Sequence, residues 1–171
     1  MKTLVIHPYD ITTKFLEAAY LGKDWTIITD NSTSKKDIRE AIKAHDRIIM
    51  MGHGSPNGLF GKGRLMIDST YIHYLREKEI VAIWCNADKF VEKYDLKGFY
   101  TGMIISETTE AYFCNVIADQ FDVDVSNELF TEAVTKSIDG SPDEMLKGMI
   151  SEYQGSDNDV IAYNALRLYK R

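Results

Sequence analysis

Five short, continuously apolar segments rich in β-branched residues most constrain the fold of this 171-residue chain. They lie at residues 3–7, 25–29, 47–51, 80–85 and 100–106, and stretches with helical periodicity separate most of them. Strands that are apolar along their whole length are typical of a parallel sheet covered on both faces. Strands that alternate with helices form βαβ units. The sequence therefore predicts an α/β fold with a doubly wound, mostly parallel, three-layer sheet of about five strands.

Two segments depart from this alternation. Residues 58–68 hold two short apolar pieces around a Gly-Lys-Gly turn, which predicts a β-hairpin after the third strand. After about residue 122 only helical patterns remain, and Ser141, Pro142 and Glu144 form a capping box with proline at the first helical position. We expect one domain over residues 1–171, with a sheet core in 1–121 and a helical part in 122–171.

Composition narrows the function classes. The net charge of −6 and the lack of a Lys/Arg cluster argue against nucleic-acid binding. The first ten residues fit neither a signal peptide nor a membrane span, so we expect a cytoplasmic protein that does not enter membranes. Cys85 and Cys114 are the only cysteines, and we expect two free thiols. Oligomeric state stays open.

The chemically suggestive residues follow the predicted strands. His53, between two glycines, ends the third strand, Cys85 ends the fourth, and Ser106 and Glu107 end the fifth. Ligands in doubly wound sheets bind at the carboxyl ends of the strands. If the third and fourth strands are neighbours, His53 and Cys85 project from adjacent strand ends. A thiol beside an imidazole can act as a nucleophile with an acid–base partner.

The segments IIMMGHG and VAIWCN resemble the corresponding parts of caspase-like cysteine peptidases, the group of caspases, clostripain and gingipains. The resemblance covers roughly residues 1–121. It implies that Cys85 is the nucleophile, His53 the general acid and the Gly54 amide part of an oxyanion hole, and that a peptide or protein is cut after one chosen side chain. The bulky Ile83 and Trp84 before the cysteine depart from the family, so a minimal or inactive member also fits.

Other residues complete the predicted site. Ser55 belongs to a loop that would shape its mouth, and Asn86 directly follows the cysteine. The carboxylates of Asp88 and Glu107 would line a pocket for a cationic side chain, although helix-start acids are common for electrostatic reasons alone. Ser106 lies at the end of the fifth strand. The remaining histidines and Cys114 have ordinary structural interpretations, and His7 is the hardest of them to dismiss because its strand end faces the same crevice.

Two alternatives remain. The GHGS sequence also resembles a strand end of sirohydrochlorin-type chelatases, where a histidine binds metal, and His7 would then serve as a second ligand. The other alternative is a non-catalytic, flavodoxin-like binding module. No CxxC or HxxxH spacing, dinucleotide-binding GxGxxG or P-loop is present, so we expect no metal and no cofactor.

Overall fold

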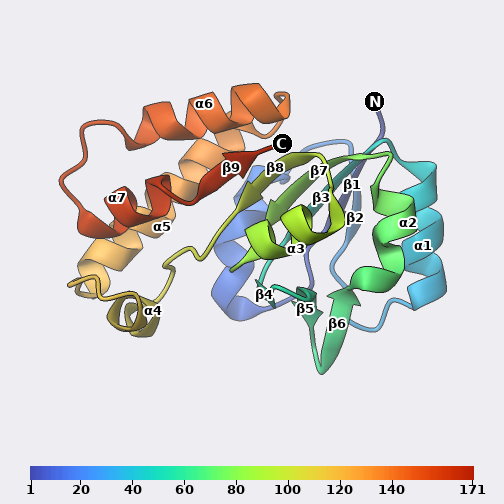
Figure 1. The fold of residues 1–171 in the computed structure, drawn as a ribbon, viewed down its shortest axis with the longest axis horizontal. Helices are drawn as coiled ribbons and strands as arrows, with labels where there is room; N and C mark the ends of the chain where they lie inside the picture. Colours follow the sequence, from blue (N-terminus) through green and yellow to red (C-terminus); the bar gives the residue numbers. More distant parts are fainter.

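The computed structural model describes residues 1–171 and is built on one six-stranded sheet (Figure 1). Its spatial order is β2-β1-β3-β7-β8-β9. The first five strands of that order are parallel, and β9 is antiparallel to β8. Their bounds are β1 (Thr3–Ile6), β2 (Thr26–Ile28), β3 (Arg47–Met51), β7 (Glu79–Ile83), β8 (Gly98–Thr101) and β9 (Leu168–Lys170). The predicted α/β class with a mostly parallel sheet is confirmed.

The parallel strands have the 2-1-3-4-5 order of flavodoxin-like sheets, with a topological switch point between β1 and β3. The chain leaves β1 toward β2 on one side and continues through β3 and β7 on the other. A crevice opens at such a point because the connections after the two strands diverge. The segments after β1 and β3 therefore line the most probable place for a ligand.

Helices cover both faces of the sheet (Figure 1). One face packs against α1 (Lys35–Ala44), α2 (Ile72–Leu75) and α3 (Ala87–Tyr94). The opposite face packs against the 3₁₀ helix η1 (Ile11–Ala19) and against α5 (Gln120–Ser137), α6 (Pro142–Tyr153) and α7 (Asp159–Ala165). Alternate residues of the inner strands enter the two cores, as in β1, where Leu4 and Ile6 lie on one side and Val5 on the other. Burial on both faces explains the continuously apolar strands.

The predicted capping box of α6 is confirmed, with Ser141 accepting from the Glu144 amide and Pro142 in the first turn. The predicted hairpin is also confirmed as β5 (Gly58–Gly61) and β6 (Arg64–Ile67), which β4 (Gly54–Ser55) extends to a separate three-stranded sheet. Gly58 has a positive φ of 138°, and a Cβ there would lie 1.9 Å from the carbonyl oxygen of Ile67. Only glycine fits this position.

Several boundaries differ from the prediction. Strands β3 and β7 end at Met51 and Ile83, two residues before His53 and Cys85, which therefore lie just beyond the strand ends. The fifth strand spans residues 98–101 rather than 100–106, so Ser106 and Glu107 lie in the connection to α4 (Thr108–Phe113) and not at a strand end. The part after residue 122 is not purely helical, because β9 adds a sixth strand to the sheet. The helical pattern begins earlier, at Gln120. None of the helices has the length and apolar character of a membrane span.

Candidate functional site

Pairing between β3 and β7 sets the geometry of the site. Met51 lies opposite Ile83 in the parallel register, and the Gly52 amide donates to the Ile83 carbonyl over 3.0 Å. His53 and Cys85 each come two residues after this pair. Both residues therefore leave the carboxyl edge of the sheet at the same height from neighbouring strands, as the sequence predicted.

His53 and Cys85 line one small pocket of about 40 Å³. Apolar side chains from η1, β7 and α5 form most of its wall, and the polar groups include those of Thr13, Thr101, Ser106 and Asn127. A space of this size holds only a few water molecules. On its other side His53 borders a wider hollow of about 370 Å³, which lies between the segment after β1 and the small sheet. The imidazole thus lies between a small pocket and a larger one.

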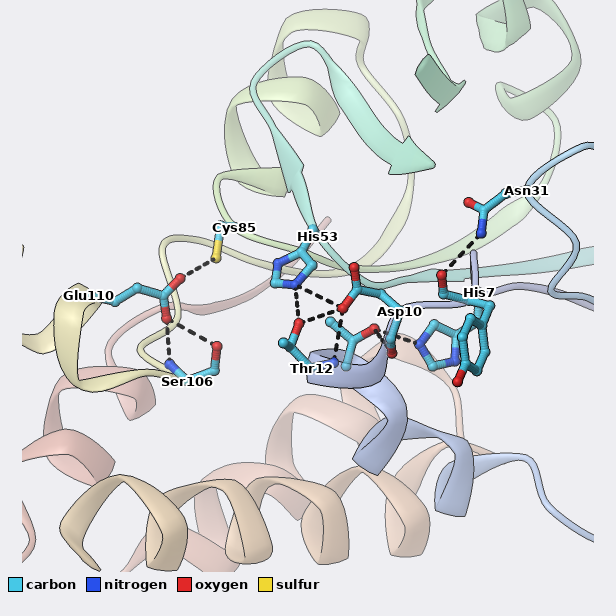
Figure 2. A network of polar contacts seen from close by, with 10 residues as sticks. His7, Asp10, Thr12, Asn31, His53, Cys85, Ser106 and Glu110 are labelled. Carbon is cyan, nitrogen blue, oxygen red and sulfur yellow. Dashed lines mark hydrogen bonds and ion pairs between the residues drawn. The ribbon is translucent and has the colours of Figure 1, made fainter. Parts of the chain in front are cut away.

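A chain of hydrogen bonds orients the imidazole (Figure 2). Thr12 Oγ1 donates to Asp10 Oδ1 over 2.7 Å and lies 2.6 Å from His53 Nε2. A hydroxyl can donate only one hydrogen bond, and the Thr12 hydroxyl donates to the Asp10 carboxylate. The Thr12 oxygen therefore accepts a hydrogen bond from the N–H at His53 Nε2. The other nitrogen of the ring, Nδ1, is then unprotonated in the neutral histidine. It makes no hydrogen bond and lies on the side of the ring nearer Cys85.

Asp10 is well suited to anchor this chain. It is the N-cap of η1, and the Thr12 amide donates to the same carboxylate oxygen over 2.9 Å. Hydrogen bonds from the side chain and the backbone of Thr12 lower the pKa of Asp10, and the neighbouring His53 contributes. The same carboxylate oxygen, Asp10 Oδ1, lies 3.9 Å from His53 Nε2.

The Cys85 thiol faces away from this chain. Its Sγ is 3.5 Å from the Ile104 carbonyl oxygen and 3.8 Å from Glu110 Oε1. Burial and the adjacent Glu110 carboxylate raise the pKa of Cys85 to about 12. Both causes disfavour the thiolate. The thiol is therefore protonated at neutral pH in this conformation, which differs from the activated nucleophile that the sequence suggested.

Glu110 is held firmly in this position. Its Oε2 accepts from the Ser106 amide at 2.7 Å, from the Ser106 hydroxyl at 3.0 Å and from the Glu107 amide at 3.1 Å. The contact with the Glu107 amide belongs to a capping box between Glu107 and Glu110 at the start of α4. The Glu110 carboxylate thus holds the loop of Ser106 and Glu107 to the first turn of α4 and lies close to the Cys85 thiol.

The turn after Cys85 is tight. Asn86 has a left-handed conformation with a φ of 65°, directly before α3, and its amide donates to the Gly102 carbonyl. Asparagine adopts this conformation more readily than most residues. The indole of Trp84 occupies the space beside Gly54, where a Cβ would lie 2.1 Å from Trp84 Cδ1. Glycine at position 54 is thus required by close packing of the indole.

The other predicted residues are dispersed. Ser106 lines the pocket with His53 and Cys85, whereas Ser55, Asp88 and Glu107 do not. Ser55 accepts the indole N–H of Trp84 through its carbonyl. Asp88 is mostly buried in the first turn of α3 beside Lys89, and Glu107 is the exposed N-cap of α4. The pocket for a cationic side chain suggested by Asp88 and Glu107 is not formed in this structure.

Sequence reasoning missed Asp10, Thr12 and Glu110. The Asp-x-Thr spacing is an N-cap pattern, but only the β1–β3 neighbourhood brings it to His53. His7 is buried and has both ring nitrogens within hydrogen-bond distance of hydroxyls, those of Tyr20 and Thr13. Both ring nitrogens of His7 are therefore engaged by these hydroxyls and are not free to bind a metal as a second ligand. Cys85 and Cys114 are free thiols, as predicted.

No cluster of three or more His, Cys, Asp or Glu side chains has the arrangement of a metal site. Comparisons with protein-family models, with curated proteins and with solved structures each gave no match.

Proposed function

We propose that this protein is a cysteine peptidase of the caspase-like type, with Cys85 as nucleophile and His53 as acid–base partner, in a latent conformation. The observation that carries the proposal is the common pocket of the two residues, which leave neighbouring strands at equal height. The expected substrate is a peptide or protein. Two free thiols are consistent with a reducing, cytoplasmic setting.

The orientation of His53 supports proton transfer from the Cys85 thiol to Nδ1 of the imidazole. With Nε2–H donated to Thr12, the lone pair of Nδ1 is available to accept the thiol proton once Sγ turns toward it. The Asp10 carboxylate then stabilises the imidazolium through the Thr12 hydroxyl. Asp10 and Thr12 are positioning residues in this scheme, since neither touches the pocket that the substrate carbonyl would enter.

The proposed reaction has two halves. Sγ of Cys85 forms a bond to the scissile carbonyl carbon while its proton passes to His53 Nδ1, and that proton then goes to the departing amine as the C–N bond breaks. Water then attacks the resulting thioester and gives one proton to His53 Nδ1, and as the C–S bond breaks His53 returns that proton to Sγ and the carboxylic acid leaves. No cofactor takes part in the scheme.

Two features support latency. The carboxylate of Glu110 lies against the thiol, and the pocket of about 40 Å³ has no room for a peptide carbonyl with its flanking atoms. Activity therefore requires a movement of α4 or of the loop before it. The same two features favour the second candidate, a binding module in which Cys85 has no catalytic role.

A peptide-library cleavage screen separates these candidates. Wild type is compared with Glu110→Gln, which removes the charge beside the thiol and weakens the hydrogen bonds that hold the loop of Ser106 and Glu107 to α4, because a neutral amide oxygen is a weaker acceptor than a carboxylate. We expect cleavage by Glu110→Gln at a rate about tenfold above wild type, since one pKa unit corresponds to a tenfold change in thiolate. Adding Cys85→Ser or His53→Ala to this variant should abolish cleavage. Cleavage that survives Cys85→Ser, or none in any folded variant, would refute the peptidase.

A further inference from the structure

Helix α4 and the start of α5 form one corner of the molecule (Figure 1). Four large hydrophobic side chains between residues 112 and 121 are 73% to 94% exposed: Tyr112, Phe113, Ile117 and Phe121. Twelve large hydrophobic side chains of the chain are exposed in all, by 39% to 94%, and a third of them fall within these ten consecutive residues. Scattered exposed hydrophobics are ordinary, but this concentration indicates an interaction site.

The corner is a formed structure and not a frayed segment. Beneath it lies a separate small core of Ile105, Ala111, Val123 and Val160, all essentially buried. Val116 and Ala118 pack against this core from the connecting loop. Tyr112 and Ile117 then border a hollow of about 430 Å³ on the outer side. The rings of Tyr112 and Phe113 contact edge to face, with centroids 5.8 Å apart. A preorganised aromatic surface of this kind is suited to binding.

The charge of the residues around this surface indicates which kind of partner fits it. Residues 98–135 contain no lysine or arginine, and their seven carboxylates are Glu107, Glu110, Asp119, Asp122, Asp124, Glu128 and Glu132. Of these, Glu132 has a lysine partner, Lys136, which also pairs with Glu152. Acidic groups therefore surround the apolar side chains on both flanks in the sequence. Complementarity requires a partner that combines apolar anchors with positive charge.

Two other occupants fit less well. In a symmetric pair of this chain the same acidic flanks would face each other, and like charges at close range oppose association. An anionic membrane surface would repel the carboxylates in the same way. We propose that this corner, defined by Tyr112, Phe113, Ile117 and Phe121, binds a basic amphipathic segment of another polypeptide. The proposal is independent of any chemistry at Cys85.

Fluorescence anisotropy with a labelled peptide tests this proposal. The peptide has about 18 residues, with leucines on one helical face and lysines on the other. One comparison peptide has the lysines replaced by glutamates, and a second has the same composition in an order without an apolar face. We expect micromolar affinity for the basic amphipathic peptide and at least tenfold weaker binding of both others. Binding should also weaken as salt is raised, because the flanking charges are exposed.

Substitutions locate the binding. Phe113→Ser and Ile117→Ser should each weaken binding at least fivefold, whereas Leu21→Ser, an equally exposed leucine at the end of η1, should leave it unchanged. Circular dichroism melting confirms that each variant is folded. Equal binding of the shuffled peptide, or affinity unaffected by Phe113→Ser, would overturn the proposal. Two other results would also overturn it. One is a wild-type dimer in analytical ultracentrifugation that Phe113→Ser dissociates, and the other is binding of the wild type to phosphatidylserine vesicles.

Discussion

At the level of single residues, burial and the adjacent Glu110 carboxylate raise the pKa of the Cys85 thiol. In the proposed dyad, an imidazolium at His53 would lower it. The sequence predicted His53 and Cys85 because strand ends are visible as the ends of apolar runs. It did not predict Glu110, since the contact depends on how residues 102–107 fold back from β8 to α4.

His7 makes stability depend on pH. Burial lowers its pKa to about 4, from 6.5 in the unfolded chain, so the unfolded state binds the extra proton between these values. Stability contributed by the neutral His7 is therefore complete above pH 7 and is lost as pH falls. The expected loss is about 2 kcal/mol between pH 7.5 and pH 5.

Urea unfolding of wild type and His7→Gln at both pH values measures this loss. The pH-dependent part attributed to His7 should disappear in the variant, whereas the exposed His73→Gln should behave as wild type. An identical pH dependence in wild type and His7→Gln would show that the buried histidine is not held neutral.

At the level of elements, the C-terminal segment shows where pattern reading fails. Residues 157–169 continue a helical periodicity, yet the helix ends at Ala165 and the chain turns into β9. The open edge of β8 provides hydrogen-bond partners that a helix could not reach, and Tyr169 stacks on Tyr100 with ring centroids 5.7 Å apart. Tertiary pairing outweighed local propensity here.

Two leucines test this assignment. Leu168 is 6% exposed and enters the core of η1, α5, α6 and α7, whereas Leu166 is 75% exposed. Leu168→Ala should lower the free energy of unfolding by about 2–4 kcal/mol, and Leu166→Ala should leave it within about 0.5 kcal/mol. Urea denaturation measures both values. Similar values for the two variants would contradict the burial of Leu168 in this core.

At the level of the whole molecule, strand order explains which site residues could be predicted. The fold class followed from the continuously apolar strands, and the neighbourhood of β3 and β7 followed from their succession along the chain. The position of β1 beside β3 could not be read from any local pattern, and it is this neighbourhood that brings Asp10 and Thr12 to His53. The chain also concentrates negative charge in its α4–α5 region, remote in sequence from the lysines of residues 14–97.

In the proposed function, His53 and Cys85 form a coupled pair once Glu110 no longer opposes the thiolate. The most direct measurement is the pH dependence of iodoacetamide alkylation at Cys85, read by peptide mass spectrometry, with Cys114 as an internal control. In Glu110→Gln the midpoint should fall by at least about one pH unit relative to wild type. Adding His53→Ala should raise the midpoint again by a similar amount. A midpoint in the double variant equal to that of Glu110→Gln would mean that His53 does not act on Cys85, and the proposed dyad would be wrong.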